Sequence, residues 1–133
     1  MELKTEKTTI NQNQEVIFEF LEQSKNFEEL MPSSIEKFEV VEDEQFNFQL
    51  SGMPEIRLKH HSKSKADQIT LTSASEKFDF DLKIFLESID QNQTNAQLVF
   101  SGNFNSMMAM MIKSPINKFI NKLVENLAKK YQD

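Results

Sequence analysis

The sequence contains no cysteine, no tryptophan and only two glycines among its 133 residues. The lack of cysteine excludes disulfides, a thiol nucleophile and a thiolate metal site. The longest unbroken apolar run, residues 107–112, is far shorter than the ~20 residues that a membrane span needs. The opening "MELKTEKTTI" has no apolar core of the signal-peptide type. We therefore expect a cytoplasmic protein that is not integral to a membrane.

Positive charge is outweighed by negative charge, because 15 lysines and arginines face 21 acidic residues and the net charge is −6. An acidic protein is a poor candidate for binding nucleic acid, whose phosphates favour basic surfaces. Residues 106–133 depart from this balance: five lysines against Glu125 and Asp133 give +3, which leaves −9 for the rest of the chain. This split indicates a solvated basic face on a C-terminal helix.

Apolar spacing at the start of the chain predicts a strand followed by two short helices. The stretch "ELKTEKTTI" is a threonine-rich strand candidate. In "NQNQEVIFEFLEQ" the apolar residues share one helical face, with Asn11 or Asn13 as the N-cap. The stretch "KNFEELMP" is typical of a second short helix that ends before Pro32.

The apolar period then changes to two for about seventy residues, which is typical of strands with one buried face. Short polar breaks divide this region into six strands, and breaks this short join antiparallel neighbours. The alternating positions are Phe38, Val40, Phe46, Phe48, Leu50, Ile56, Leu58, Ile69, Leu71, Phe78, Phe80, Leu82, Ile84, Leu86, Ala96, Leu98, Phe100 and Phe104.

The last segment, "PINKFINKLVENLAKKYQ", predicts a long amphipathic helix. The fold class is therefore α+β, with a seven-stranded antiparallel sheet. Such a sheet is about 30 Å wide, whereas one helix covers only about 10 Å. The sheet must curl around the helix to bury its apolar face. Either a cavity remains between them or the twelve phenylalanines fill it.

This order of elements resembles the START-like, birch-pollen-allergen-like helix-grip superfamily (SRPBCC). The likeness rests on the runs "EVIFEFLEQSKNFEELMP", "SGM" and "SPINKFINKLVENLAK", and covers essentially the whole chain. It is greatest to small bacterial single-domain, polyketide-cyclase-like members, and it implies one domain over residues 1–133. Members bind lipids, sterols, hormones or polyketides in a cavity, and a few are enzymes or co-chaperones. The glycine-rich loop of the plant allergens is replaced here by "VEDEQ".

Few residues are candidates for chemistry. His60 and His61 are adjacent, so on a strand they face opposite ways and cannot chelate one metal. His60 shares its face with Leu58 and should point inward, where it could contact a ligand or act as a general base. Ser73 and Glu6 could be polar contacts in a pocket, but each also fits a strand end near solvent. We expect neither a metal nor another cofactor.

The stretch "NSMMAMMIKSP" holds four of the seven methionines. At about 100° per residue, Met107 and Met111 fall opposite the core face of the helix that follows. Because Ser-Pro is a favoured helix start, we predict a short helix at about 106–112, then a break or sharp kink, and a long helix over 115–131. The methionines could line a pocket mouth, pack against the end of the sheet, or contact a partner.

Three functions fit these features. The first is non-enzymatic binding of a hydrophobic small molecule or lipid by a monomer or weak dimer. The second is a cofactor-free cyclase or hydrolase that uses His60, and the third is a co-chaperone-like interaction module. The predicted ligand-binding residues are His60, Phe48, Leu58, Leu71, Phe80, Leu82, Phe100, Met107, Met108, Met111 and Phe119.

Overall fold

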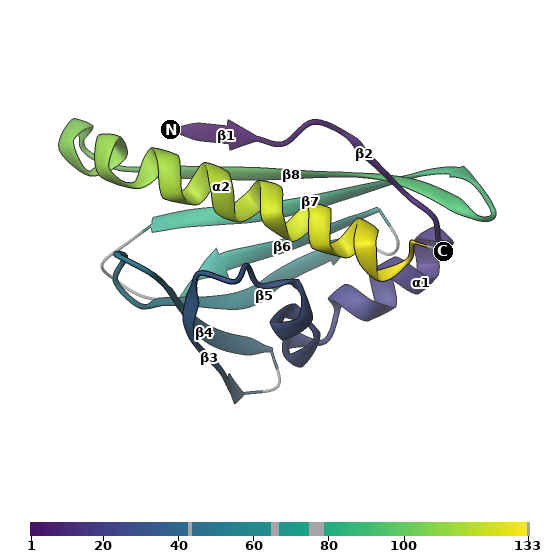
Figure 1. The fold of residues 1–133 in the computed structure, drawn as a ribbon, viewed down its shortest axis with the longest axis horizontal. Coiled ribbons are helices and arrows are strands. Elements are labelled where there is room, and N and C mark those ends of the chain that lie inside the picture. The colour runs from purple at the N-terminus through teal and green to yellow at the C-terminus, as the bar shows by residue number, and fades with distance from the viewer. Residues whose placement is uncertain (43, 65–66, 75–78, 133) are drawn as a thin grey trace.

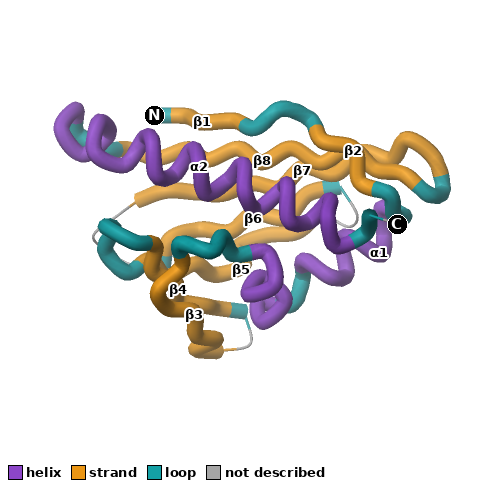
Figure 2. Tube along the Cα trace, viewed as in Figure 1, coloured by secondary structure: helices purple, strands orange, loops and turns teal. Residues whose placement is uncertain are grey.

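A computed structural model describes residues 1–42, 44–64, 67–74 and 79–132, without the side chains of residues 62–64. Phe78, one of the predicted strand positions, lies outside the described residues. Figure 1 and Figure 2 show a sheet with one long helix, α2, lying across one face. The elements are β1 (Glu2–Lys4), β2 (Thr8–Ile10), α1 (Gln14–Leu21), the 3-10 helix η1 (Ser24–Leu30), β3 (Ile35–Glu42), β4 (Gln45–Leu50), β5 (Ile56–Ser64), β6 (Gln68–Ser73), β7 (Asp79–Asp90), β8 (Gln93–Asn103) and α2 (Ser106–Lys130).

The strands form one antiparallel sheet in the order β1-β8-β7-β6-β5-β4-β3, and β2 also pairs with β8. This is the predicted α+β helix-grip fold, with a curved sheet around a C-terminal helix. The predicted first strand is split in two at Thr5. Its amide donates to the Leu98 carbonyl (2.9 Å), and its hydroxyl accepts from the Leu98 amide (3.0 Å). Both halves therefore stay on β8, and the strand count rises to eight.

The edge strand β3 keeps the predicted alternation but buries its inner face only in part. Its pairing with β4 shifts register near both ends, which is typical of β-bulges. Phe38 still reaches the core side and stacks on Phe46, with ring centroids 5.4 Å apart. Val40, predicted to face inward, is 42% exposed. Val40 lies directly opposite Phe46 in the ladder, so it keeps the predicted face, and its side chain is exposed because β3 is the edge strand of the sheet.

The concave face of the sheet buries the apolar side of α2. Burial of one large apolar side chain contributes roughly 1.5–3 kcal/mol, so this contact is a major source of stability. The buried residues of the helix are Ile112, Ile116, Phe119, Ile120, Leu123, Val124 and Leu127. No helix within the described part of the chain is both long enough and apolar enough to span a bilayer.

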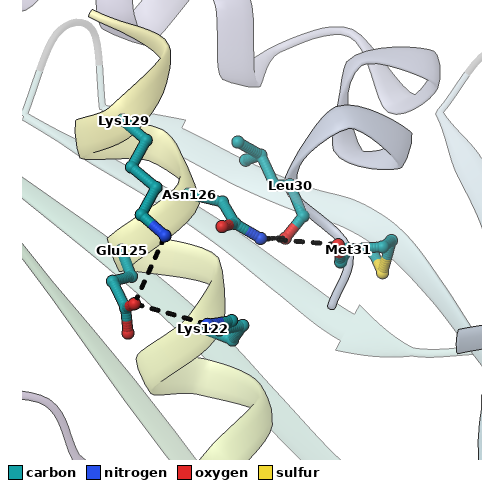
Figure 3. Close-up of polar contacts among 6 residues, drawn as sticks. All are labelled: Leu30, Met31, Lys122, Glu125, Asn126 and Lys129. Atoms are coloured by element: carbon teal, nitrogen blue, oxygen red, sulfur yellow. Dashed lines mark hydrogen bonds and ion pairs between the residues drawn. The ribbon is translucent and has the colours of Figure 1, made fainter. Parts of the chain in front are cut away.

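Polar contacts cap α1 and join η1 to α2. Asn13 caps α1, as one of the two predicted caps, by accepting the Glu15 amide (2.9 Å). The Asn126 side chain donates to the Leu30 carbonyl (2.9 Å) at the end of η1, as Figure 3 shows. Lys130 contacts Glu29 at 2.9 Å, and this hydrogen bond is the main cause of the raised pKa of the lysine. The contacts of Asn126 and Lys130 hold the end of η1 beside α2.

The predicted break at Ser114-Pro115 is wrong, because α2 is one helix from Ser106 to Lys130 and Pro115 lies inside it. Asn105 caps the helix by accepting the Met108 amide (2.9 Å). Pro115 has no N–H to donate to the carbonyl of Met111, four residues earlier. Met111 itself is 66% exposed, so water can reach this turn. Water can therefore replace the missing hydrogen-bond donor, and the helix continues through Pro115.

Replacing Pro115 tests this continuity. In a continuous helix, Pro115→Ala should raise the free energy of unfolding by about 1–3 kcal/mol, since alanine restores the missing donor. Ser114→Ala should be neutral, because the serine is mid-helix. Chemical denaturation measures both. Loss of about 1 kcal/mol in Ser114→Ala, with no gain in Pro115→Ala, would instead indicate a helix that starts at this pair.

Candidate functional site

An apolar pocket lies between the first half of α2 and the concave face of the sheet. Its free volume is about 20 Å³, which is close to the room that one water molecule occupies. All eight lining side chains are apolar, and none can titrate. They are Met53, Pro54, Ile56, Phe80, Phe100, Phe104, Ile112 and Ile116.

The aromatic wall of this pocket depends on a close approach at Gly102. The rings of Phe80 and Phe100 lie 5.0 Å apart, and Phe104 stacks on Phe100 at 6.1 Å. A Cβ added to Gly102 would lie 2.6 Å from the Phe104 ring and 2.7 Å from the Phe80 Cβ. Only glycine therefore fits between these two phenylalanines.

The opposite wall comes from the turn between β4 and β5. Gly52 has φ of 80°, a left-handed conformation that favours glycine. The turn is closed by the Met53 amide, which donates to the Leu50 carbonyl at 3.0 Å. The Gln49 side chain donates to the Met53 carbonyl at 3.1 Å. Met53 is buried and lines the pocket together with Ile112 and Ile116 of α2.

The predicted ligand residues divide between the pocket and the packed core. Phe80 and Phe100 line the pocket. Phe119 stacks on Phe48 with ring centroids 4.8 Å apart, and neither ring lines the apolar pocket. Three further predicted ligand residues are packed in the core and are at most 2% exposed: Leu58, Leu71 and Leu82.

The predicted methionines do not line the apolar pocket. Met108 is half-buried against the core, whereas Met107 and Met111 are 74% and 66% exposed. The exposure of Met107 and Met111 follows from the continuity of α2, because an unbroken helix turns these two side chains away from the sheet. The pocket residues absent from the prediction include Ile112 and Ile116. Their four-residue spacing on the core face was the available signal.

His60 points inward, as its strand parity predicts, but its ring has a structural role. Its Nε2 lies 3.0 Å from the carbonyl of Leu21, the last residue of α1, and donates its hydrogen there. Its Nδ1 lies 3.4 Å from the Glu44 carbonyl. His61, in contrast, is exposed. The Nε2 of His60 caps a helix end, so it is not free to abstract a proton from a ligand.

The other polar candidates stay apart from one another. Ser73 lies opposite Leu58 in the β5–β6 ladder, and its hydroxyl accepts from the Phe80 amide at 3.4 Å. Glu6 is exposed between β1 and β2, at the other end of the sheet. The two do not form a triad with His60. Within the described ranges, no three His, Asp or Glu side chains are grouped to hold a metal ion.

A second hollow, which we call the serine-lysine groove, lies on the adjacent side of α2. It is an open groove of about 420 Å³ between the helix, the segment after η1 and the β4–β5 turn. Its lining combines hydroxyls and ammonium groups with an apolar floor. The lining residues are Pro32, Ser33, Ser34, Leu50, Ser51, Ser114, Pro115, Lys118, Phe119 and Lys122.

Known proteins resemble this chain in fold. No protein-family model and no curated protein matches the sequence. A START superfamily protein from Mycobacterium smegmatis superposes with a TM-score of 0.73 at 9% identity, covering 98% of this chain and 99% of that one. A norcoclaurine synthase point mutant from Thalictrum flavum, in complex with a transition-state analogue, gives 0.76 at 8% identity, covering 98% and 93%.

A third similar structure is the Aha1 dimer from Colwellia psychrerythraea, with a TM-score of 0.71 at 15% identity, covering 98% of this chain and 96% of that one. At these identities the likeness shows the fold alone. The chain therefore has the helix-grip fold that the sequence resemblance predicts.

Substitution of His60 tests its structural role. His60→Ala removes the partner of a buried helix-end carbonyl, so the free energy of unfolding should fall by about 1–3 kcal/mol. His61→Ala is the matched control, and it should change stability by less than about 0.5 kcal/mol because the side chain is exposed. Urea denaturation measures both. Equal stability of the two variants would contradict the capping role of His60.

Proposed function

We propose that the protein binds a hydrophobic small molecule or lipid, without reacting with it, in the apolar pocket under the first half of α2. The observation that carries this proposal is the chemistry of the lining, which is apolar at every position. Ligand pockets are predominantly apolar and sit between packed layers of a fold. A similar structure, that of norcoclaurine synthase, is in complex with a transition-state analogue, which supports a small-molecule ligand for this chain.

The pocket must widen to admit such a ligand, since about 20 Å³ is too small for one. Three features favour widening at the start of α2. Pro115 removes one backbone hydrogen bond at that point, which lowers the cost of bending the helix. The outer side of the first turns has no packing partner within the described chain, because Met107 and Met110 are 74% and 81% exposed. Methionine also adapts to new shapes.

A binding role without catalysis fits the groups near the pocket. The eight lining side chains include no acid, base or nucleophile. The inward His60 already donates Nε2–H to Leu21. A cytoplasmic location, a single domain and a monomeric or weakly dimeric state stay predictions from the sequence.

An interaction module is the second candidate function. The exposed methionines Met107, Met110 and Met111 favour it, because large exposed apolar side chains are typical of contact surfaces. The similar Aha1 structure is a dimer. A pull-down that recovers one stoichiometric protein, together with an empty pocket, would favour this function over ligand binding.

Native mass spectrometry of protein purified from its own host tests the proposed function. We expect an apolar adduct that dissociates chemically unchanged. With N-phenyl-1-naphthylamine as a fluorescent apolar probe, Ile112→Phe should weaken binding at least about tenfold, because the larger side chain fills the pocket.

Leu127→Phe is the matched control, since Leu127 is equally buried on the same helix face but does not line the pocket. It should leave probe affinity unchanged. If Ile112→Phe fails to fold, Ile112→Ala replaces it and should strengthen binding by enlarging the pocket. No adduct, together with equal probe affinity in wild type and Ile112 variants, would contradict the proposal.

A further inference from the structure

The serine-lysine groove has a lining that differs in charge from the rest of the protein. The chain has a net charge of −6, yet the ten groove residues include two lysines and no acid. Lys118 and Lys122 are four residues apart on α2, so their side chains lie on one face of the helix. This face looks into the groove and gives it a positive local charge.

Four hydroxyl groups surround these lysines. Ser33 and Ser34 follow η1, Ser51 begins the β4–β5 turn, and Ser114 lies one turn before Lys118 on α2. The Ser51 amide donates to the Ser34 carbonyl at 3.1 Å, which joins the two loops into one wall. All four serines are exposed, so their hydroxyls can donate to a ligand.

The lysines are available to an anion. Lys118 forms no ion pair with any described residue. Lys122 lies 3.4 Å from Glu125, which also contacts Lys129 at 3.7 Å. Figure 3 shows Glu125 between the two lysines. If Lys122 turns to a ligand, Glu125 keeps Lys129 as its partner, so no carboxylate is left without a cation.

Apolar side chains line the base of the groove and extend along α2 away from the two lysines. Pro32, Leu50 and Phe119 line its base. At 100° per residue, Met107 and Met111 fall on the same side of α2 as Lys118. The two methionines are exposed, and they extend this side of the helix toward its N-terminus. The arrangement places ammonium groups at one end of the helix face and apolar side chains at the other.

We propose that the serine-lysine groove binds an anionic amphiphile, with its phosphate or carboxylate on Lys118, Lys122 and the serine hydroxyls and its apolar part toward Pro115 and Met111. Ammonium groups and hydroxyls bind such oxygen anions through charge-assisted hydrogen bonds. This site is separate from the proposed function, because the Ser51–Pro54 turn has the groove on one side and the apolar pocket on the other.

Backbone amide NMR shifts under titration with n-octyl phosphate test the site. We expect shifts centred on Ser33, Ser34, Ser51 and Lys118. The double variant Lys118→Gln/Lys122→Gln should weaken binding about tenfold or more, because both charge-assisted contacts are lost. The matched control is Lys25→Gln/Lys113→Gln, which removes the same charge from two exposed lysines outside the groove lining and should keep the affinity.

Three further probes identify the source of the anion. Octyl glucoside has the same chain without charge and should not shift the groove amides. Binding of inorganic phosphate alone would assign the site to a free anion. Binding of phosphatidylcholine vesicles only when they contain phosphatidic acid would assign it to a lipid headgroup. Unshifted groove amides with every anionic probe, or equal affinity of the two double variants, would overturn the proposal.

Discussion

The contact between the apolar side of α2 and the concave face of the sheet is the constraint on which the structure depends. An antiparallel sheet with one apolar face must cover that face, and here a single helix does so. The strands curl around the helix for this reason. The contact also divides α2 into an inner side, which is apolar, and an outer side, which carries lysines and methionines. The apolar pocket lies on the inner side, and the serine-lysine groove lies where the two sides meet.

The interior is filled mainly by ring stacking. Phe119 of the helix stacks on Phe48 of the sheet, and Phe46 stacks on both Phe27 and Phe38. Little free volume remains under the N-terminal half of α2, near Ile112. The lining there is apolar, and this half of the helix contains Pro115. A binding role for this fold therefore requires motion at that end. Polar contacts such as Asn126 with Leu30 hold the opposite end in place.

Much of the fold was predictable, because the change from helical period to period two is strong in this sequence. The inward position of His60 also followed from strand parity. Its bond to Leu21 did not, since it depends on how α1 meets β5. The helix phase correctly separated Met107 and Met111 from the core face. The inferred break at Pro115 was wrong. The prediction used only the local preference of Ser-Pro for a helix start, whereas the helix is capped at Asn105 and Met111 is exposed to solvent.

The central claim is that the apolar interior is closed at rest and opens by movement of the first turns of α2. Amide hydrogen exchange along the helix tests it most directly. The account predicts that residues 106–112 exchange much faster than residues 120–127, and that N-phenyl-1-naphthylamine slows exchange in the first segment. Uniform protection along the whole helix, unchanged by the probe, would contradict it.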